Sequence, residues 1–214
     1  MLKPDSYSTG DQRLEMIPFL PENYHRVLEV GCGEGAFSRN LSQTSERWGV
    51  ELDDTVAEKA KPLFYRVLVG KYEQVMQDLP DDYFDLVICN DVIEHMEDHD
   101  FFLKSVKTKM KTGGTLVASI PNIRYLKVLF ELMVKKDWRY RPHGTLYTGH
   151  LRFFTRKSLL RTLSEHGFKI RKFKGINRAG RTFLTFIPVA LLLVLTLGYY
   201  RDSLYVQYGF AAEK

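Results

Sequence analysis

A short glycine-rich segment follows the first apolar stretch of the chain. Residues 31–35 read Gly-Cys-Gly-Glu-Gly and come directly after the stretch 25–30, His-Arg-Val-Leu-Glu-Val. Glycines at such a turn let backbone N–H groups approach a ligand where any Cβ would collide. Glu29 places a carboxylate just before the turn, which would attract an ammonium group and repel a pyrophosphate. The segment therefore favours a ligand with a cationic end.

Polar side chains also follow two later apolar stretches. Glu51 ends the stretch 47–52, where an acidic side chain can accept hydrogen bonds from both hydroxyls of a ribose. The stretch 83–89 is followed by a polar cluster that contains Asn90, Asp91, Glu94 and His95. Ligands of open α/β sheets bind at the carboxyl ends of the strands, so these positions predict a site for a ligand that contains adenosine.

Four motifs in this order resemble the class I S-adenosylmethionine-dependent methyltransferases, especially the branch of the ubiquinone-biosynthesis O-methyltransferases. The motifs are Leu-Glu-Val-Gly-Cys-Gly-Glu-Gly at 28–35, Gly-Val-Glu-Leu at 49–52, Phe-Asp-Leu-Val-Ile-Cys-Asn-Asp-Val-Ile-Glu-His at 84–95 and Lys-Thr-Gly-Gly-Thr-Leu at 111–116. The resemblance covers about 27–120. It implies S-adenosyl-L-methionine as the cofactor and S-adenosyl-L-homocysteine as its product.

The resemblance also implies which residues bind this cofactor. The residues that would line its methionine part are Glu29, Gly31, Cys32, Gly33 and Gly35. Glu51 would hold the ribose and Leu52 would pack on the adenine, while Asn90, Asp91 and Val92 would lie at the sulfonium. One position departs from the family pattern: Lys71 stands where an acidic residue usually meets the adenine amino group.

Methyl transfer to a hydroxyl also needs a group that takes the proton. His150 is our first candidate for this base, since it lies where an acceptor would be held against the cofactor, and His95 and His143 are the others. His95 has a second interpretation as a residue that packs over the cofactor. We expect Asn122, Tyr125 and Arg152 to bind the acceptor, Arg152 through a phosphate or carboxylate. The spacing of acidic residues predicts no metal site.

The acceptor is suggested by two further segments. Residues 119–125 and 149–155 resemble a subgroup of these methyltransferases that is often associated with surface-glycan assembly. This similarity favours transfer to an O or N atom of a small molecule, such as a nucleotide-linked sugar or a glycan.

Strand-like and helix-like stretches alternate along the chain, which predicts one α/β domain over 1–214. We expect a Rossmann-like, doubly wound sheet of seven mostly parallel strands. The expected strands lie at 25–30, 47–52, 64–69, 83–89, 115–120, 168–173 and 203–212. Three additions to a minimal fold are predicted: an N-terminal helical extension at 1–24, a helical substrate lid at 121–154, and an apolar helix at 182–200 before the last strand.

Two of the expected helices have clear end signals. Asp98 begins a helix that runs to Met110, with Phe101, Phe102, Leu103 and Val106 facing inward, and Gly113-Gly114 would stop it. Thr155 is the expected N-cap of a helix that runs to His166, and Gly167 closes it.

The formal net charge of +5 arises mostly in the second half of the chain. This asymmetry favours a phosphorylated acceptor or an anionic membrane surface, and nucleic acid is an unlikely partner because no RNA-binding appendage is present. Residues 182–200 carry no charge, so we expect contact with a membrane surface, a homodimer interface or core packing from them. Two cysteines and an N-terminus without a signal peptide indicate a cytoplasmic protein, peripheral at a membrane if 182–200 binds one.

Two other classes of function remain open at this point. A non-catalytic protein could keep the cofactor fold as a binding partner in a complex. An NAD-dependent oxidoreductase also fits the glycine-rich turn, because Gly31, Gly33 and Ala36 satisfy the loose dinucleotide fingerprint. Binding of S-adenosylhomocysteine would distinguish a methyltransferase from the oxidoreductase.

Overall fold

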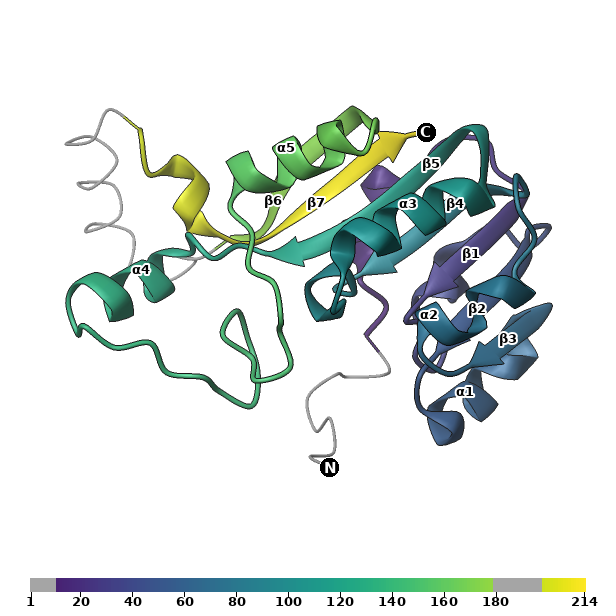
Figure 1. The fold of residues 1–214 in the computed structure, drawn as a ribbon, viewed down its shortest axis with the longest axis horizontal. Coiled ribbons are helices and arrows are strands. Elements are labelled where there is room, and N and C mark those ends of the chain that lie inside the picture. Colours follow the sequence, from purple (N-terminus) through teal and green to yellow (C-terminus); the bar gives the residue numbers. More distant parts are fainter. Residues whose placement is uncertain (1–10, 179–197) are drawn as a thin grey trace.

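The computed structural model describes residues 11–178 and 198–214. It contains one seven-stranded sheet with the strand order β3-β2-β1-β4-β5-β7-β6 (Figure 1). The strands are β1 Arg26–Val30, β2 Glu46–Glu51, β3 Arg66–Val69, β4 Phe84–Asn90, β5 Met110–Pro121, β6 Lys169–Arg178 and β7 Tyr205–Glu213. The first five strands pair in parallel, and β7 runs antiparallel to both β5 and β6. This confirms the predicted mostly parallel, Rossmann-like sheet.

Helices connect the strands in the expected alternation. The α-helices are α1 Asp54–Ala60, α2 Tyr72–Val75, α3 His99–Lys109, α4 Leu126–Met133 and α5 Arg156–Glu165. The 3-10 helices are η1 Leu14–Phe19, η2 Phe37–Asn40, η3 Lys61–Leu63, η4 Met76–Asp78, η5 Ile93–His95 and η6 Arg201–Leu204. Helices α3 and α5 lie over the same face of the sheet (Figure 1).

Alternating side chains of the strands build a core on each face. Val87 and Cys89 of β4 belong to the cluster that includes residues of α3 and α5. Leu86 and Ile88 of the same strand belong to a second cluster, to which η1 and η2 contribute. Successive side chains of a strand point to opposite faces, so a strand that is buried on both faces reads as continuously apolar. This explains why β4 could be recognised from its sequence.

The helix over 98–110 differs from its prediction in two ways. Phe101 does not face inward but is 41% exposed. The helix ends at Lys109, before the glycines, because Met110 already pairs with Phe84 as the first residue of β5. Gly113 and Gly114 lie inside β5 at the register shift, where a Cβ on Gly114 would come within 3.0 Å of the carbonyl oxygen of Phe84.

The other end signals are confirmed. The Thr155 side chain accepts a hydrogen bond from the backbone N–H of Ser158, and the Ser158 hydroxyl accepts one from the backbone N–H of Thr155. This capping box begins α5, and Gly167 follows the helix with a φ of 70°.

The additions to the minimal fold are described only in part. The described portion of the N-terminal extension contains the single 3-10 helix η1. Most of the predicted lid at 121–154 is irregular, with α4 as its helix, and it lies beyond the carboxyl end of β5 (Figure 1). The apolar helix predicted at 182–200 falls, apart from 198–200, outside the described residues. Within the described ranges, the chain has no helix with the length and apolar character of a membrane span.

Candidate active site

The glycine-rich turn leaves β1 in a left-handed backbone conformation. The φ angles are 70° at Gly31, 55° at Gly33 and 78° at Gly35. The N–H groups of Gly31 and Cys32 donate to the carbonyl oxygen of Val50, so the turn is joined to the end of β2. A Cβ on Gly31 would lie 2.8 Å from Val92 Cγ2. Conformation and packing therefore both require glycine at position 31.

Two carboxylates flank this turn. Glu29 is 4% exposed and accepts a hydrogen bond of 2.6 Å from the Ser38 hydroxyl. Burial raises the pKa of Glu29 to about 7. Glu51 accepts hydrogen bonds from the backbone N–H groups of Gly33, Leu52 and Asp53 at 2.8–3.1 Å. These bonds fix the Glu51 carboxylate between the turn and the end of β2, where a ribose would reach it.

The residues at this crevice fit the implied cofactor. Both amide atoms of Asn90, the last residue of β4, are buried and have no hydrogen-bond partner within the described parts of the chain. A buried amide in this state lacks the partners that a polar ligand would supply. Leu52 is 64% exposed, as expected of a side chain that packs on an adenine ring when the cofactor is bound.

Two predicted cofactor residues pack against the protein itself. The Cys32 side chain is buried against β2, and a Cβ on Gly49 would lie 2.8 Å from Cys32 Sγ. Val92 is buried against Gly31. Both therefore shape the crevice, and direct contact of their side chains with the cofactor remains a prediction. Lys71 pairs with Glu97 at 3.0 Å and is exposed.

Arg13 is a site residue that the sequence did not reveal. It lies in the N-terminal segment just before η1, and its guanidinium forms an ion pair with Asp91. The same guanidinium donates to the Ser119 hydroxyl at 3.0 Å, and the Gln207 amide donates to both oxygens of Asp91 at 2.8 Å. Both oxygens of the Asp91 carboxylate therefore have hydrogen-bond partners at the end of β4. No local pattern indicates a contact between residues 78 positions apart.

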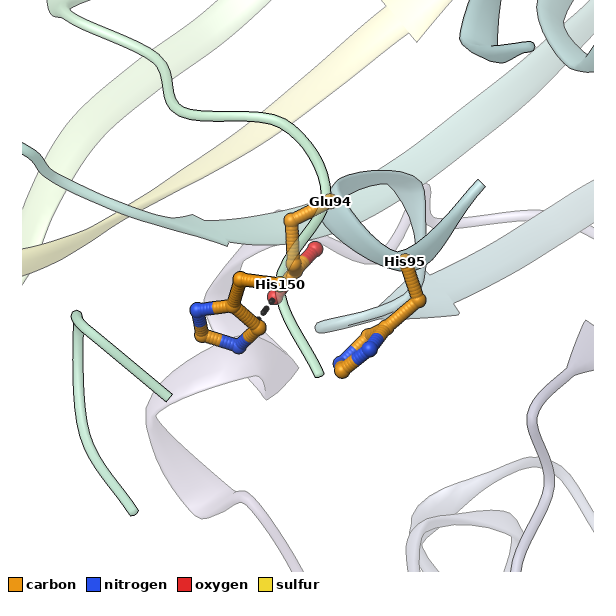
Figure 2. Close-up of side chains that lie close together, drawn as sticks. All are labelled: Glu94, His95 and His150. Carbon is orange, nitrogen blue, oxygen red and sulfur yellow. Dashed lines mark ion pairs between the residues drawn. The ribbon is translucent and has the colours of Figure 1, made fainter. Parts of the chain in front are cut away.

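The lid brings His150 to η5. The backbone N–H groups of Leu151 and Arg152 donate to the carbonyl oxygen of Glu94 at 2.8 and 3.0 Å. His150 and His95 lie with their ring centroids 4.8 Å apart, and the Glu94 carboxyl points toward His150 (Figure 2). His150 Nε2 lies 3.9 Å from Glu94 Oε1. Two of the three candidate bases, His95 and His150, therefore meet beside Glu94, which lies in the motif but is not among the predicted site residues.

Backbone carbonyls orient both imidazoles. His150 Nδ1 lies 3.0 Å from the carbonyl oxygen of Thr145, and His95 Nδ1 lies 3.0 Å from that of Gly149. A carbonyl oxygen only accepts, so each Nδ1 carries the proton. Burial lowers the pKa of His150, and burial together with His150 lowers the pKa of His95 to about 4. Both rings are neutral near pH 7.

A cavity of about 130 Å³ adjoins these groups. The residues that line it are Asp91, Glu94, Pro121, His143, Gly144, Thr145, Tyr147, His150, Val206 and Gln207. Asp91 is the immediate neighbour of Asn90 and Val92 in the chain, so the cavity opens next to the predicted sulfonium position. The wall includes the third candidate histidine, His143.

The predicted acceptor-binding residues do not lie on this wall. Asn122 is fully buried, and its amide donates to the backbone carbonyls of Asp202 and Tyr205. The Arg152 guanidinium donates to the carbonyl oxygens of Leu151 and Glu97. Tyr125 is the N-cap residue of α4. Roles of these three residues in acceptor binding stay predictions, and in this conformation Asn122 holds the lid to η6 and β7.

Known proteins resemble this chain in sequence and fold. A family model described as a methyltransferase domain matches residues 7–172. Ubiquinone biosynthesis O-methyltransferase of Aeromonas salmonicida is 25% identical over 165 residues, covering 72% of this chain and 67% of that protein. An S-adenosylmethionine-dependent methyltransferase structure from Archaeoglobus fulgidus superposes with a TM-score of 0.69 at 20% identity, covering 96% of this chain and 95% of that one.

A second similar structure is that of a possible histamine N-methyltransferase from Thermotoga maritima. Its TM-score is 0.62 at 20% identity, with 94% of this chain and 88% of that chain covered. At these identities the superpositions support the fold, whereas the family model spans most of the chain. The chain belongs to the methyltransferase domain family, and it is an S-adenosylmethionine-dependent methyltransferase.

Proposed function

We propose that the chain transfers the methyl group of S-adenosylmethionine to an O or N atom of a small-molecule acceptor whose reacting end enters the cavity beside Asp91, Glu94 and His150. The observation that carries this proposal is that the wall of the cavity and the cofactor crevice share the end of β4. The named relatives include a ubiquinone biosynthesis O-methyltransferase and a possible histamine N-methyltransferase, which is consistent with either acceptor atom.

The size of the cavity limits what can enter. A volume of about 130 Å³ is smaller than the roughly 300–1,000 Å³ of pockets that enclose a whole drug-sized ligand, so the cavity admits one end of an acceptor. Among the described residues that line it there is no lysine or arginine. A sugar attached to a nucleotide or a glycan would therefore place its reacting group in the cavity and keep its phosphates outside, toward the basic surface of the second half.

The residues of the cofactor crevice and of the cavity have distinct tasks in this proposal. The cofactor supplies an electrophilic methyl group. Asn90 and Glu29 hold and orient the methionine part, and Glu51 holds the ribose. His150 Nε2 carries a lone pair, because Nδ1–H is bound to Thr145, and so it can accept the proton of the acceptor. We expect most of the rate acceleration to come from holding the acceptor atom in line with the methyl carbon and the sulfur.

Replacement of His150 tests this role. We expect His150→Gln to lower kcat about 100-fold, because a general base contributes on the order of 10²–10⁴. The affinity for S-adenosylhomocysteine should stay unchanged, since His150 does not line the cofactor crevice. The measurement is transfer of radiolabelled methyl from S-adenosylmethionine to a panel of nucleotide sugars, glycans and amines. Unchanged kcat in His150→Gln would remove this residue from the mechanism.

A further inference from the structure

The Glu94 carboxyl lacks the hydrogen bonds that a buried acid normally has. It is 1% exposed, and neither oxygen has a hydrogen-bond partner in the described parts of the chain. Burial, and then the charge of Asp91, raise the pKa of Glu94 well above its usual value. A buried polar group without hydrogen-bond partners is unfavourable. Because Glu94 lines the cavity, a ligand there can supply the missing hydrogen bonds.

His150 presents a second acceptor to the same space. Its Nδ1–H donates to the carbonyl oxygen of Thr145, which leaves the lone pair on Nε2. The distance of 3.9 Å between His150 Nε2 and Glu94 Oε1 is too long for a hydrogen bond. One small atom between them can nevertheless reach both at about 2.8 Å. Figure 2 shows the carboxyl and the imidazole pointing toward one another.

The charges on the cavity wall favour a ligand group that brings hydrogen-bond donors. The Asp91 carboxylate is already compensated by Arg13 and by the Gln207 amide. Glu94 has no such partner among the described residues, and His150 is a neutral acceptor near pH 7. An anionic group would be unfavourable here, whereas an ammonium or amine would satisfy both acceptors.

We propose that the methyl acceptor is an amine, and that its nitrogen lies between Glu94 Oε1 and His150 Nε2. This inference rests on the proposed function and narrows it to N-methylation. A neutral amino nitrogen has an N–H bond for each of the two acceptors and keeps its lone pair for the methyl carbon. A hydroxyl has one hydrogen, so it can donate to only one of the two acceptors.

The reaction balances with the groups present. An acceptor that arrives as R–NH₃⁺ releases its third proton through His150 Nε2 to water, so the imidazole is again a neutral acceptor of one N–H bond before methyl transfer. The nitrogen lone pair then forms the N–C bond as the S–C bond breaks, and the bonding electrons stay on sulfur. The products are S-adenosylhomocysteine and R–NH₂⁺–CH₃. Glu94 acts as a specificity-determining residue that binds the second N–H.

Matched amines and alcohols test the proposal directly. Wild-type protein would be given radiolabelled S-adenosylmethionine with benzylamine or benzyl alcohol, and with glucosamine or glucose, in the presence of EDTA. We expect transfer to amines at least 100-fold faster than to the matched alcohols, because buried groups that bind N–H bonds reject an analogue that lacks one. Binding of the same compounds to the protein saturated with S-adenosylhomocysteine would be measured by calorimetry.

Variants of Glu94 separate recognition from structure. Glu94→Leu should lower kcat/KM for amines at least 100-fold, and Glu94→Gln, which keeps one acceptor oxygen, about tenfold. Neither should change the affinity for S-adenosylhomocysteine, which also reports whether the variant is folded. Glu97→Gln is the matched control, since Glu97 is exposed three residues away and pairs with Lys71.

Several outcomes would overturn the proposal. They are equal methylation of alcohols and amines, full activity in Glu94→Gln, and neither binding nor methylation of any amine by protein that binds S-adenosylhomocysteine. Activity lost in EDTA and restored by Mg²⁺, Mn²⁺ or Zn²⁺ would also do so, because ligand atoms of Glu94, His95 and His150 lie within 4.8 Å of one another. Failure to bind S-adenosylhomocysteine would instead contradict the proposed function.

Discussion

Glu29 is a residue whose expected role in cofactor binding lowers the stability of the folded chain at neutral pH. Its carboxyl is buried beside the glycine-rich turn, and burial raises its pKa to about 7, compared with 4.5 for an unperturbed glutamate. The folded state therefore binds the proton more tightly than the unfolded chain. The resulting stabilisation is complete below about pH 4.5 and is lost as the pH rises through 7. A buried carboxylate at neutral pH is reasonable if an ammonium group binds it.

Substitution of Glu29 tests this conflict. We expect Glu29→Gln to be more stable than the wild type at pH 8.5, by up to about 3 kcal/mol, and to differ little at pH 4.5. The affinity for S-adenosylhomocysteine should fall at least tenfold, because the neutral amide does not attract the ammonium. Urea unfolding at the two pH values and calorimetry are the measurements. Glu58→Gln, at an exposed position of α1, is the control, and equal stability differences at both pH values would refute this role of burial.

The positions of single residues could be predicted from sequence around the glycine-rich turn but not around the cavity. Glu29 and Glu51 lie within a few residues of the turns that define them, and the turn motif carries the information. Arg13 and Gln207 reach Asp91 from opposite ends of the chain. His150 was selected, but its neighbour Glu94 was not, because the pairing depends on how the lid folds back onto η5.

At the scale of elements, the N-terminal segment closes one side of the site. Arg13 has a left-handed backbone conformation and connects this segment to the end of β4 through Asp91, and to β5 through Ser119. Removal of one partner of a largely buried ion pair strongly destabilises the folded protein, because the remaining charge lacks compensation. These polar contacts add to the apolar packing of Met16 and Phe19, and they fix the segment at the position where the acceptor cavity begins.

A double-mutant cycle measures this anchor. We expect Arg13→Ala to lower the free energy of unfolding by about 2–4 kcal/mol and Asp91→Asn by a similar amount. The double variant should lose clearly less than the sum, with a coupling energy of about 1–3 kcal/mol. Urea denaturation of the four proteins gives these values. Strictly additive losses would show that the two side chains do not stabilise each other.

Elements were predictable where their signals are local. The Thr155 capping box and the continuous apolar run of β4 both depend on neighbouring residues, and both were identified. The end of α3 was misplaced because Met110 leaves the helix to pair with Phe84, a contact that no nearby residue indicates. The inward position assigned to Phe101 failed for a similar reason, since Phe102 and Leu103 already fill the contact with the sheet.

At the scale of the whole molecule, the cofactor and the acceptor are held by different parts of the chain. The crevice is built by the turns after β1 and β2 and by the end of β4, within about the first half of the sequence. The cavity adds the lid and β7, which runs antiparallel and brings Val206 and Gln207 to the carboxyl ends of the parallel strands. The class of enzyme follows from the first part, and the choice of acceptor depends on the second.

The sequence left the ligand of the turn open between a dinucleotide and an adenosyl amino acid. Calorimetric titration with S-adenosylhomocysteine, with NAD as the second titrant, is the most direct test. We expect micromolar binding of S-adenosylhomocysteine to the wild type, at least tenfold weaker binding to Glu51→Ala, and unchanged binding to Glu58→Gln at an exposed position of α1. Absence of binding to the wild type, or binding of NAD instead, would contradict the assignment of this cofactor site.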